Sequence, residues 1–404
     1  MNALREGHVT AGLIGIFWAF VMAITVSVSL SFASGLGFRP GTLGCVLLGL
    51  GGGLVALYVR DRALLFAGFP LVAVALLFTP LSPVLFGDAV PVLWQVAAAV
   101  LFGVFTIWPL KAMLVEAHPG ALTRHAFEDA VIRFLTGFGY IIFTAAVLIP
   151  FYVMVMTSLK SQQALLRNPL DFSIELNRGW ELFSSYTELF GQFGFGSYLW
   201  TSFYVSVLTV LITLAFSVPG AYAVARLRFK GRAAFSRSIL LIYMVPMIVL
   251  ALPIYIAFSM TGLRNTIPGL ILIYPVTTIP VALYMLQGYF RGLPVEVEEA
   301  GLMDGLSRLQ VILKITLPLS LPAMVSVSLY VFMIAWNEFL LAFMLLDDPS
   351  IFTLTRGVAM LNSSEIPRQH LMAGAVIATI PIMALFLGLE RFMTKGLTAG
   401  SVKG

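Results

Sequence analysis

Few residues of this 404-residue chain have types and spacings that could do chemistry. The four histidines are scattered, and the nearest pair, His118 and His125, is seven residues apart, which is not a spacing of metal ligands. No glycine-rich phosphate loop ends in Gly-Lys-Ser or Gly-Lys-Thr, and no Ser/His/Asp arrangement stands out. We therefore expect a protein that is not an enzyme, binds no metal and hydrolyses no nucleotide by itself.

The charged residues are more informative by their position. Of the 24 basic and 19 acidic residues, only Glu338 lies well inside a long apolar run. Carriers that are driven by protons or sodium ions place several ionisable groups at membrane depth. The chain is therefore expected to take its energy from another source.

Three polar or aromatic neighbours, Trp336, Asn337 and Glu338, and Tyr284 in another apolar run are candidates for a substrate pathway. Ligand sites combine aromatic walls with a few placed polar groups, and these four side chains offer both. Two alternatives stay open. Trp336 would equally suit an interfacial anchor, and Asn337 a hydrogen bond between membrane helices.

The elements that position these residues are apolar runs. Only 11% of the residues are charged and 59% are hydrophobic, whereas soluble domains carry about 25% charged residues. A spanning helix needs about 20 apolar residues. We predict an all-α integral membrane protein with about ten transmembrane helices, the first of them a retained span rather than a secretory signal. The runs are 11–33, 41–59, 63–80, 90–110, 137–158, 198–225, 238–260, 267–289, 319–345 and 371–392.

The distribution of basic residues indicates an orientation. With the N-terminus in the cytoplasm, 17 of the 24 basic residues lie inside. Cytoplasmic loops carry an excess of lysine and arginine, so both termini are predicted inside and the loops 159–197 and 346–370 outside. Because the basic residues lie in short loops between apolar runs, the net charge of +5 indicates no nucleic-acid partner.

The chain divides into three parts by the character of its runs. Residues 1–110 hold four tightly spaced spans, and residues 137–404 hold six spans with longer loops. Between them, residues 111–136 form a predicted amphipathic cytoplasmic linker, in which 116–133 mixes charged and apolar side chains as an interfacial helix does. An ordinary polar linker is the alternative.

The segment 294–317, between the eighth and ninth runs, carries helix start and stop signals. Pro294 suits a first helical turn, and the glutamates that follow complement the positive helix end. Gly305 supplies a stop, and Ser307 with Gln310 matches the capping box of a second helix. We predict two short helices that project into the cytoplasm.

The same segment contains Glu299-Ala300-Gly301, then Gly305, then Ile315-Thr316-Leu317-Pro318. This pattern resembles the EAA signature of ATP-binding-cassette (ABC) importer permeases, with Gly301 in place of the second alanine. The small side chain is kept, although glycine lowers helix propensity by up to about 1 kcal/mol.

Further segments are similar to the maltose-type branch of that family. They are Ala221–Arg226, Leu263–Thr266, Trp336–Phe339 and the end of the chain from Lys395 to Gly404. Together they cover roughly residues 137–404. The resemblance implies a six-helix ABC importer permease core preceded by four extra spans, which have no counterpart in that pattern.

The resemblance also implies a function and partners. It implies a multi-pass permease of the bacterial inner membrane that imports an oligosaccharide or glycoside. The partners would be a second homologous permease, two ATPase subunits that bind ATP and magnesium, and a periplasmic solute-binding protein; this chain itself would bind no cofactor. ATPase-coupling residues would be Glu298, Glu299, Ala300, Gly301, Leu302, Met303, Asp304, Gly305 and Leu306, and tail contacts Gly396, Leu397, Thr398, Ala399, Gly400 and Lys403.

Three alternatives stay open at this point. One is an ion-coupled secondary carrier, for which Glu338 alone is available as an ion site. Another is an importer permease for a non-sugar solute. The third is a structural or assembly subunit in which residues 1–110 are the working part.

Overall fold

The computed structural model describes residues 3–59, 61–169, 171–363 and 365–398. The chain forms two compact units, Met1–Leu182 and Phe183–Gly404, and each is described by itself. Nearly all ordered segments are helical, as predicted.

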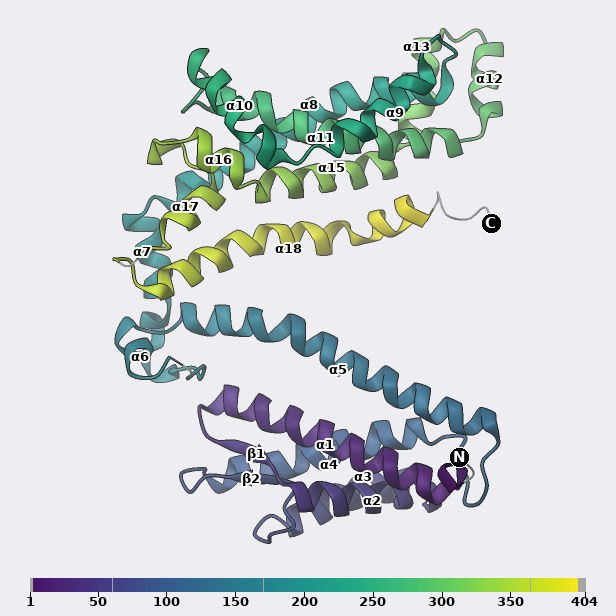
Figure 1. The fold of residues 1–404 in the computed structure, drawn as a ribbon, viewed down its shortest axis with the longest axis vertical. Helices are drawn as coiled ribbons and strands as arrows, with labels where there is room; N and C mark the ends of the chain where they lie inside the picture. The colour runs from purple at the N-terminus through teal and green to yellow at the C-terminus, as the bar shows by residue number, and fades with distance from the viewer. Residues whose placement is uncertain (1–2, 60, 170, 364, 399–404) are drawn as a thin grey trace. The chain divides into compact units, whose positions relative to one another are not determined.

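The first unit is built on the three long helices α1, α4 and α5 and the shorter apolar helices α2 and α3 (Figure 1). The exception to the helical pattern is a short antiparallel pair of strands in which Arg39 lies opposite Leu85. In chain order the elements are η1 (Ala3–Arg5), α1 (Gly7–Ser34), β1 (Phe38–Pro40), α2 (Thr42–Tyr58), α3 (Arg62–Ala75), β2 (Val84–Phe86), α4 (Val92–Met113), α5 (Arg124–Ser158), α6 (Gln162–Arg167) and η2 (Leu176–Phe183).

Helices α1 and α2 pack with their backbones in close contact. A Cβ atom added to Gly15 would lie 2.1 Å from the Gly49 carbonyl oxygen, and one added to Gly53 would lie 2.0 Å from the Ala11 carbonyl oxygen. Small residues are what allow membrane helices to approach so closely, since lipid supplies no hydrophobic drive for helix association. The glycines of the first two runs therefore determine this helix pair.

The segment predicted as a separate linker is partly helix. Residues from Arg124 onward are the first turns of α5, whose N-cap Thr123 accepts a hydrogen bond from the Ala126 backbone amide. Ion pairs at four-residue spacing, Arg124–Glu128 and Arg133–Asp129, support these turns. The boundary between the two compact units falls after Leu182. The division into 1–110, 111–136 and 137–404 stays a prediction.

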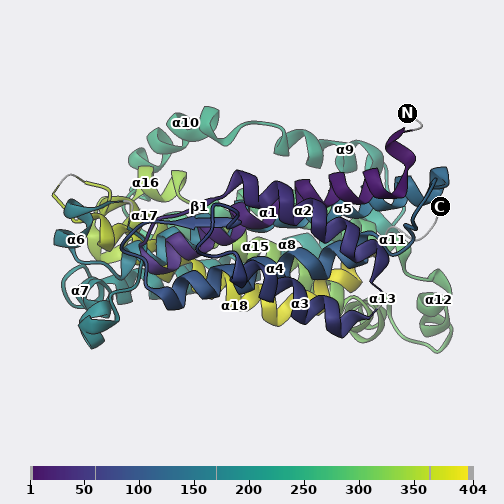
Figure 2. The same cartoon turned by 90° about the horizontal axis from the view of Figure 1, so that it is seen from below.

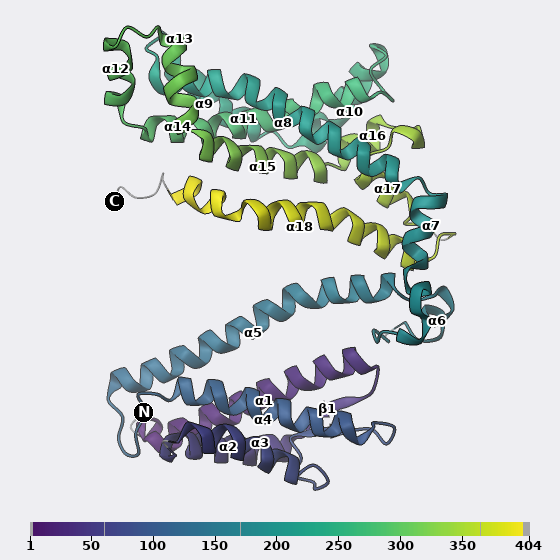
Figure 3. The same cartoon turned by 180° about the vertical axis from the view of Figure 1, so that it is seen from behind.

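The second unit places α8 beside α11 and α15, with α12 and α13 at one end of these helices (Figures 1 and 3). The elements are α7 (Ser184–Gln192), α8 (Phe195–Arg226), α9 (Arg232–Tyr243), α10 (Met247–Met260), α11 (Ile267–Gly292), α12 (Val295–Met303), α13 (Arg308–Val311), η3 (Ile312–Thr316), α14 (Leu317–Leu319), α15 (Leu321–Asn337), α16 (Leu340–Leu345), η4 (Pro349–Ile351), α17 (Leu354–Met360) and α18 (Arg368–Thr398).

A stripe of buried hydroxyl groups runs along α8 at four-residue spacing, through Thr209, Thr213 and Ser217. The Thr213 and Thr278 hydroxyls form a hydrogen bond of 2.7 Å, and the Ser217 hydroxyl donates to the Ile279 carbonyl at 3.3 Å. Hydroxyl groups of this kind join helices in membranes. The stripe fixes α8 against α11.

Part of the predicted set of ten spanning helices is shown. Among the described residues, six helices are long and apolar enough to cross a membrane: α1, α4, α5, α8, α11 and α18. A seventh would be the pair Arg308–Leu319 and Leu321–Asn337, which is bent by 73°. Three further apolar helices, α2, α3 and α10, have fewer than 18 residues.

Two predicted spans are interrupted for identifiable reasons. The run 238–260 is divided between α9 and α10, as Figure 2 shows, because Pro246 precedes α10 and disfavours helical backbone in the residue before it. The run 319–345 is interrupted after α15, where Glu338 has an extended backbone. The Glu338 carboxylate accepts hydrogen bonds from the backbone amides of Leu341 and Ala342 and so starts α16.

Candidate functional site

Helix α12 ends in the turn that the sequence predicts. Gly305 has a φ of +83°, a left-handed conformation that glycine adopts without strain. The Leu306 amide donates to the Gly301 carbonyl and the Gly305 amide to the Leu302 carbonyl, both at 3.1 Å. These two bonds form a Schellman motif, which satisfies the last carbonyls of the helix.

The next helix starts with the predicted capping box. The Ser307 hydroxyl accepts from the Gln310 backbone amide at 3.3 Å, and the Gln310 side chain accepts from the Ser307 amide at 2.8 Å. Helix α13 continues into η3, one π-helical turn, and the chain bends by 73° before α15. Two short helices therefore precede α15, as the sequence predicts.

One face of α12 is buried against its own unit. Glu298 and Gly301, three residues apart, are both buried, because residues at that spacing share a helix face. A Cβ atom on Gly301 would lie 2.5 Å from Cδ1 of Ile315, so the glycine lets α12 lie close to η3.

The buried Glu298 carboxylate has three partners. It accepts hydrogen bonds from the Tyr222 hydroxyl of α8 and from the Thr316 hydroxyl at the end of η3, each at 3.1 Å. The Arg226 Nε atom lies 3.4 Å from Glu298 Oε1, and Arg226 also donates to the Leu293 carbonyl at 2.7 Å. The roles of Tyr222, Arg226 and Thr316 were not predicted, although all three lie in motifs that the sequence analysis singled out.

The other face of α12 is exposed. Glu299 and Ala300 lie on the surface, and Leu302 and Met303 expose 37% and 87% of their surface. Met303 and Leu302 are thus apolar side chains on a short helix that lies at the end of the long helices (Figure 3). An exposed apolar contact beside a carboxylate is suited to binding a protein partner.

The four candidates for the substrate pathway do not converge. The Trp336 indole is buried and donates to the Ala378 carbonyl at 3.1 Å, and Asn337 donates to the Met333 carbonyl of its own helix at 2.9 Å. Tyr284 is exposed on α11, ten residues beyond Tyr274, which interacts with Glu338. Ten residues correspond to roughly 15 Å along a helix, so Tyr284 lies well away from Glu338.

Trp336 borders an apolar hollow of about 540 Å³. The hollow is also lined by Trp200, Phe203, Phe332 and Pro381. Its walls are aromatic and aliphatic side chains, which suit an apolar neighbour better than a hydroxyl-rich ligand.

At the other end of the long helices, an ion pair joins two loops. Arg264, in the turn before α11, pairs with Asp347, and its guanidinium lies 4.8 Å from the centre of the Tyr255 ring. Asn265 has a φ of +56°, and its side-chain oxygen accepts from the amides of Asp347 and Asp348 at 2.9 Å. The segment Leu263–Thr266 is therefore a structural brace.

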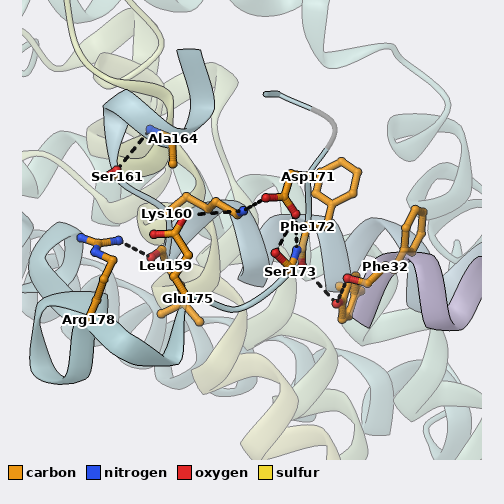
Figure 4. Close-up of polar contacts among 11 residues, drawn as sticks. Phe32, Leu159, Lys160, Ser161, Ala164, Asp171, Phe172, Ser173, Glu175 and Arg178 are labelled. Atoms are coloured by element: carbon orange, nitrogen blue, oxygen red, sulfur yellow. Dashed lines mark hydrogen bonds and ion pairs between the residues drawn. The ribbon is translucent and has the colours of Figure 1, made fainter. Parts of the chain in front are cut away.

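In the first unit, polar contacts hold the segment after α5 (Figure 4). Lys160 is 4% exposed, and its Nζ atom lies 2.8 Å from Asp171 Oδ2 and 4.0 Å from Glu175 Oε1. The Tyr152 hydroxyl donates to the carbonyls of Phe32 and Phe172. These contacts fasten the segment to the end of α1.

The candidate tail contacts lie at the end of the described chain. The backbone of Gly396, Leu397 and Thr398 belongs to α18, but the side chains of Leu397 and Thr398 lie outside the described part of the chain. Ala399, Gly400 and Lys403 lie outside the described residues altogether. Within the described residues, no group of three or more His, Cys, Asp or Glu side chains could hold a metal ion.

Comparison with known proteins assigns this arrangement to a class. Residues 217–398, which include α12 and the Glu298 cluster, match the family described as "Binding-protein-dependent transport system inner membrane component". The chain is 37% identical over 270 residues to the inner membrane ABC transporter permease protein YcjP of Escherichia coli, covering 66% of this chain and 95% of YcjP.

A second relative and a solved structure agree. The chain is 34% identical over 280 residues to the trehalose/maltose transport system permease protein MalG of Thermococcus litoralis, covering 69% of this chain and 99% of MalG. A chain of a bacterial ABC transporter that imports the acidic polysaccharide alginate has the same fold, with a TM-score of 0.56 and 22% identity over 67% of this chain and 98% of that one.

The chain therefore belongs to the family of binding-protein-dependent ABC transport permeases. It is a multi-pass inner-membrane protein and the membrane component of its transport system, so it is not an enzyme. About a third of the chain lies outside each match to these relatives.

Proposed function

We propose that this permease imports a carbohydrate, an oligosaccharide or a glycoside. The proposal is supported by the trehalose/maltose system of the MalG relative and by the alginate importer that shares the fold. Family membership also weighs against an ion-coupled carrier, because these relatives are ABC transporter permeases. The alternative is that the permease imports a non-sugar solute, and substrate assays would have to exclude it.

We propose the partners that this class of permease implies. They are a second homologous permease, two ATPase subunits, a periplasmic solute-binding protein and the lipid bilayer. ATP and magnesium bind to the ATPases, and this chain binds no cofactor. The pathway opens outward when ATP clamps the ATPases together, since a partner shifts a two-state protein only by binding its states differently.

The observation that carries the coupling proposal is the exposed face of α12. Glu299 offers a charge to a polar or basic group of the ATPase, and Ala300, Leu302, Met303 and Asp304 lie exposed beside it. The turn at Gly305 and Leu306 sets the angle to the next helix. This face is the EAA-like coupling surface of the permease.

Topology completes the proposal. Both termini lie in the cytoplasm, and residues 1–110 add four spans to a six-span core. The shorter apolar helices α2, α3 and α10 count among the ten spans. At 17 residues α2 is roughly 25 Å long, close to the thickness of the hydrocarbon layer.

We also propose a role for residues outside α12, in the substrate pathway and in the C-terminal tail. The substrate pathway includes Trp336, Asn337 and Glu338, with Tyr284 at a different depth. The tail residues Gly396 to Lys403 contact the ATPases, as the resemblance implies.

A charge reversal tests the coupling face. In the complete transporter reconstituted in proteoliposomes, Glu299→Lys is expected to abolish ATP-driven uptake of sugar and to release the ATPases from the membrane fraction. The matched control is Glu365→Lys, which makes the same change at an exposed glutamate between α17 and α18. Wild-type uptake and normal ATPase retention by Glu299→Lys would show that α12 is an ordinary surface helix.

A further inference from the structure

We propose that Glu298 is a positioning residue that ties α12 to α8 and to the bend before α15, so that movement of α12 is transmitted to both. The proposal rests on the proposed docking role of α12. Glu299 lies on the exposed face of α12, which the proposed function assigns to the ATPase, whereas Glu298, one residue earlier, is buried against the unit's own helices. Successive residues of a helix are rotated by about 100°, so one helix can serve both contacts.

The contacts of Glu298 reach two separate elements. Tyr222 belongs to the last turns of α8, and Thr316 is the last residue of η3. Each carboxylate oxygen accepts one hydroxyl, Oε2 from Tyr222 and Oε1 from Thr316, at 3.1 Å. A single side chain thus joins three segments that are distant in sequence.

Burial makes this link stiff. The Glu298 and Arg226 side chains are 11% and 9% exposed. A buried charge is tolerated only when it is paired and hydrogen-bonded. Moving α12 away from α8 would separate Glu298 from Arg226 and leave each charge without its partner. Arg226 also donates to the Leu293 carbonyl, just before α12, and therefore holds the start of the helix from the same side.

The third segment has irregular helical geometry. Thr316 ends a π-helical turn, and such turns are frequent at functional sites. After it, the buried Ser320 hydroxyl donates to the Thr316 carbonyl at 2.6 Å, at the bend that precedes α15. A pull on Thr316 therefore acts at the bend, where a small displacement changes the direction of α15.

The test removes the hydroxyl donors and leaves the partner-facing surface untouched. Tyr222→Phe and Thr316→Val, singly and combined, delete one or both hydrogen bonds to Glu298 without changing any charge. Thr277→Val is the control, because the Thr277 hydroxyl donates to the Tyr274 carbonyl of its own helix. The reconstituted complete transporter gives two measurements: sugar moved per ATP hydrolysed, and ATPase retained on the membrane.

For the double variant we expect at least about a fivefold fall in sugar moved per ATP, the lower range of allosteric couplings, with ATPase retention at the wild-type level. Thr277→Val should keep both values. Adding Glu298→Gln to the double variant should lower the ratio little further, since residues of one network are not additive. This pattern separates a transmitting contact from one that merely stabilises the fold.

Two results would overturn the inference. A wild-type ratio in the double variant would show that Glu298 transmits nothing, while the docking role of Glu299 would stand. Loss of the ATPases in the Tyr222→Phe and Thr316→Val single variants would show that the cluster only shapes the docking surface. Failure of the docking proposal itself is recognised separately, by ATPase retention in Glu299→Lys.

Discussion

The Lys160 ammonium lies 2.8 Å from the Asp171 carboxylate, and 3% of the lysine side chain is exposed. The pair joins the chain just after α5 to a residue eleven positions further on (Figure 4). Asp171→Asn leaves a buried cation without its nearest partner, which is expected to cost on the order of 1–3 kcal/mol of local stability. Hydrogen exchange of residues 161–175 measures the loss. Glu175→Gln is the control, because its oxygen lies 4.0 Å away and should matter less; equal effects would contradict the geometry.

The same pair predicts a pH dependence. Burial raises the pKa of the Asp171 carboxyl, but hydrogen bonds from Lys160 and Ser173 outweigh it and hold the pKa below its ordinary value. A lowered folded pKa gives stability that is present above the unfolded value of about 3.9 and is lost as the pH falls through the folded pKa. Exchange protection should therefore be constant near neutral pH and fall in acid. Asp171→Asn should remove this contribution; an unchanged acid profile would refute it.

Substitutions at Gly301 test how large a side chain the contact between α12 and η3 tolerates. A Cβ at this position would clash with the flexible end of Ile315 and would meet Val311 and Leu306 at ordinary contact distance. Gly301→Ala is therefore expected to keep uptake and to gain up to about 1 kcal/mol in helix propensity. Gly301→Phe should push α12 away from η3 and abolish uptake, while the protein still reaches the membrane. Uptake assays with quantified membrane levels decide this, and full activity of Gly301→Phe would show that the close packing is dispensable.

Substitutions at Gly305 test whether the left-handed turn after α12 is needed for coupling. Gly305→Val places a β-branched residue at a φ of +83°, with an expected cost on the order of 1–3 kcal/mol, whereas Gly305→Asn should be milder because asparagine tolerates this region. ATPase retention and uptake should fall in the order Gly, Asn, Val. Gly288→Ala, in the open face of α11, is the control. Equal activity of all three would mean that the angle after α12 is not needed.

The orientation in the membrane is tested with single cysteines, after Cys45→Ala. Leu166→Cys reports on the segment predicted outside and Lys230→Cys on the one predicted inside, and both positions are exposed. An impermeant thiol reagent should label position 166 in intact cells and position 230 only after permeabilisation. The reverse pattern would invert the topology.

Several features followed from the sequence because they depend on neighbours along the chain. The membrane class follows from long apolar runs, and the two short helices of 294–317 follow from Pro294, Gly305 and the Ser307–Gln310 capping box, whose bonds span three residues. The EAA-like spacing of Glu299, Gly305 and Pro318 is also local, and its role in coupling stays a prediction.

Tertiary structure decided what depends on distant partners. Nothing local distinguishes Glu298 from Glu299, yet one is buried with Tyr222 and Thr316 and the other is exposed. Arg264 and Asp347 are 83 residues apart in sequence, and no periodicity indicates their pairing. The run 319–345 has the composition of one span, but its helix is interrupted at Glu338. The Glu338 carboxylate accepts hydrogen bonds from two backbone amides that follow it. A buried polar group is placed by the partners that compensate its lost water, and only the folded chain brings those partners together.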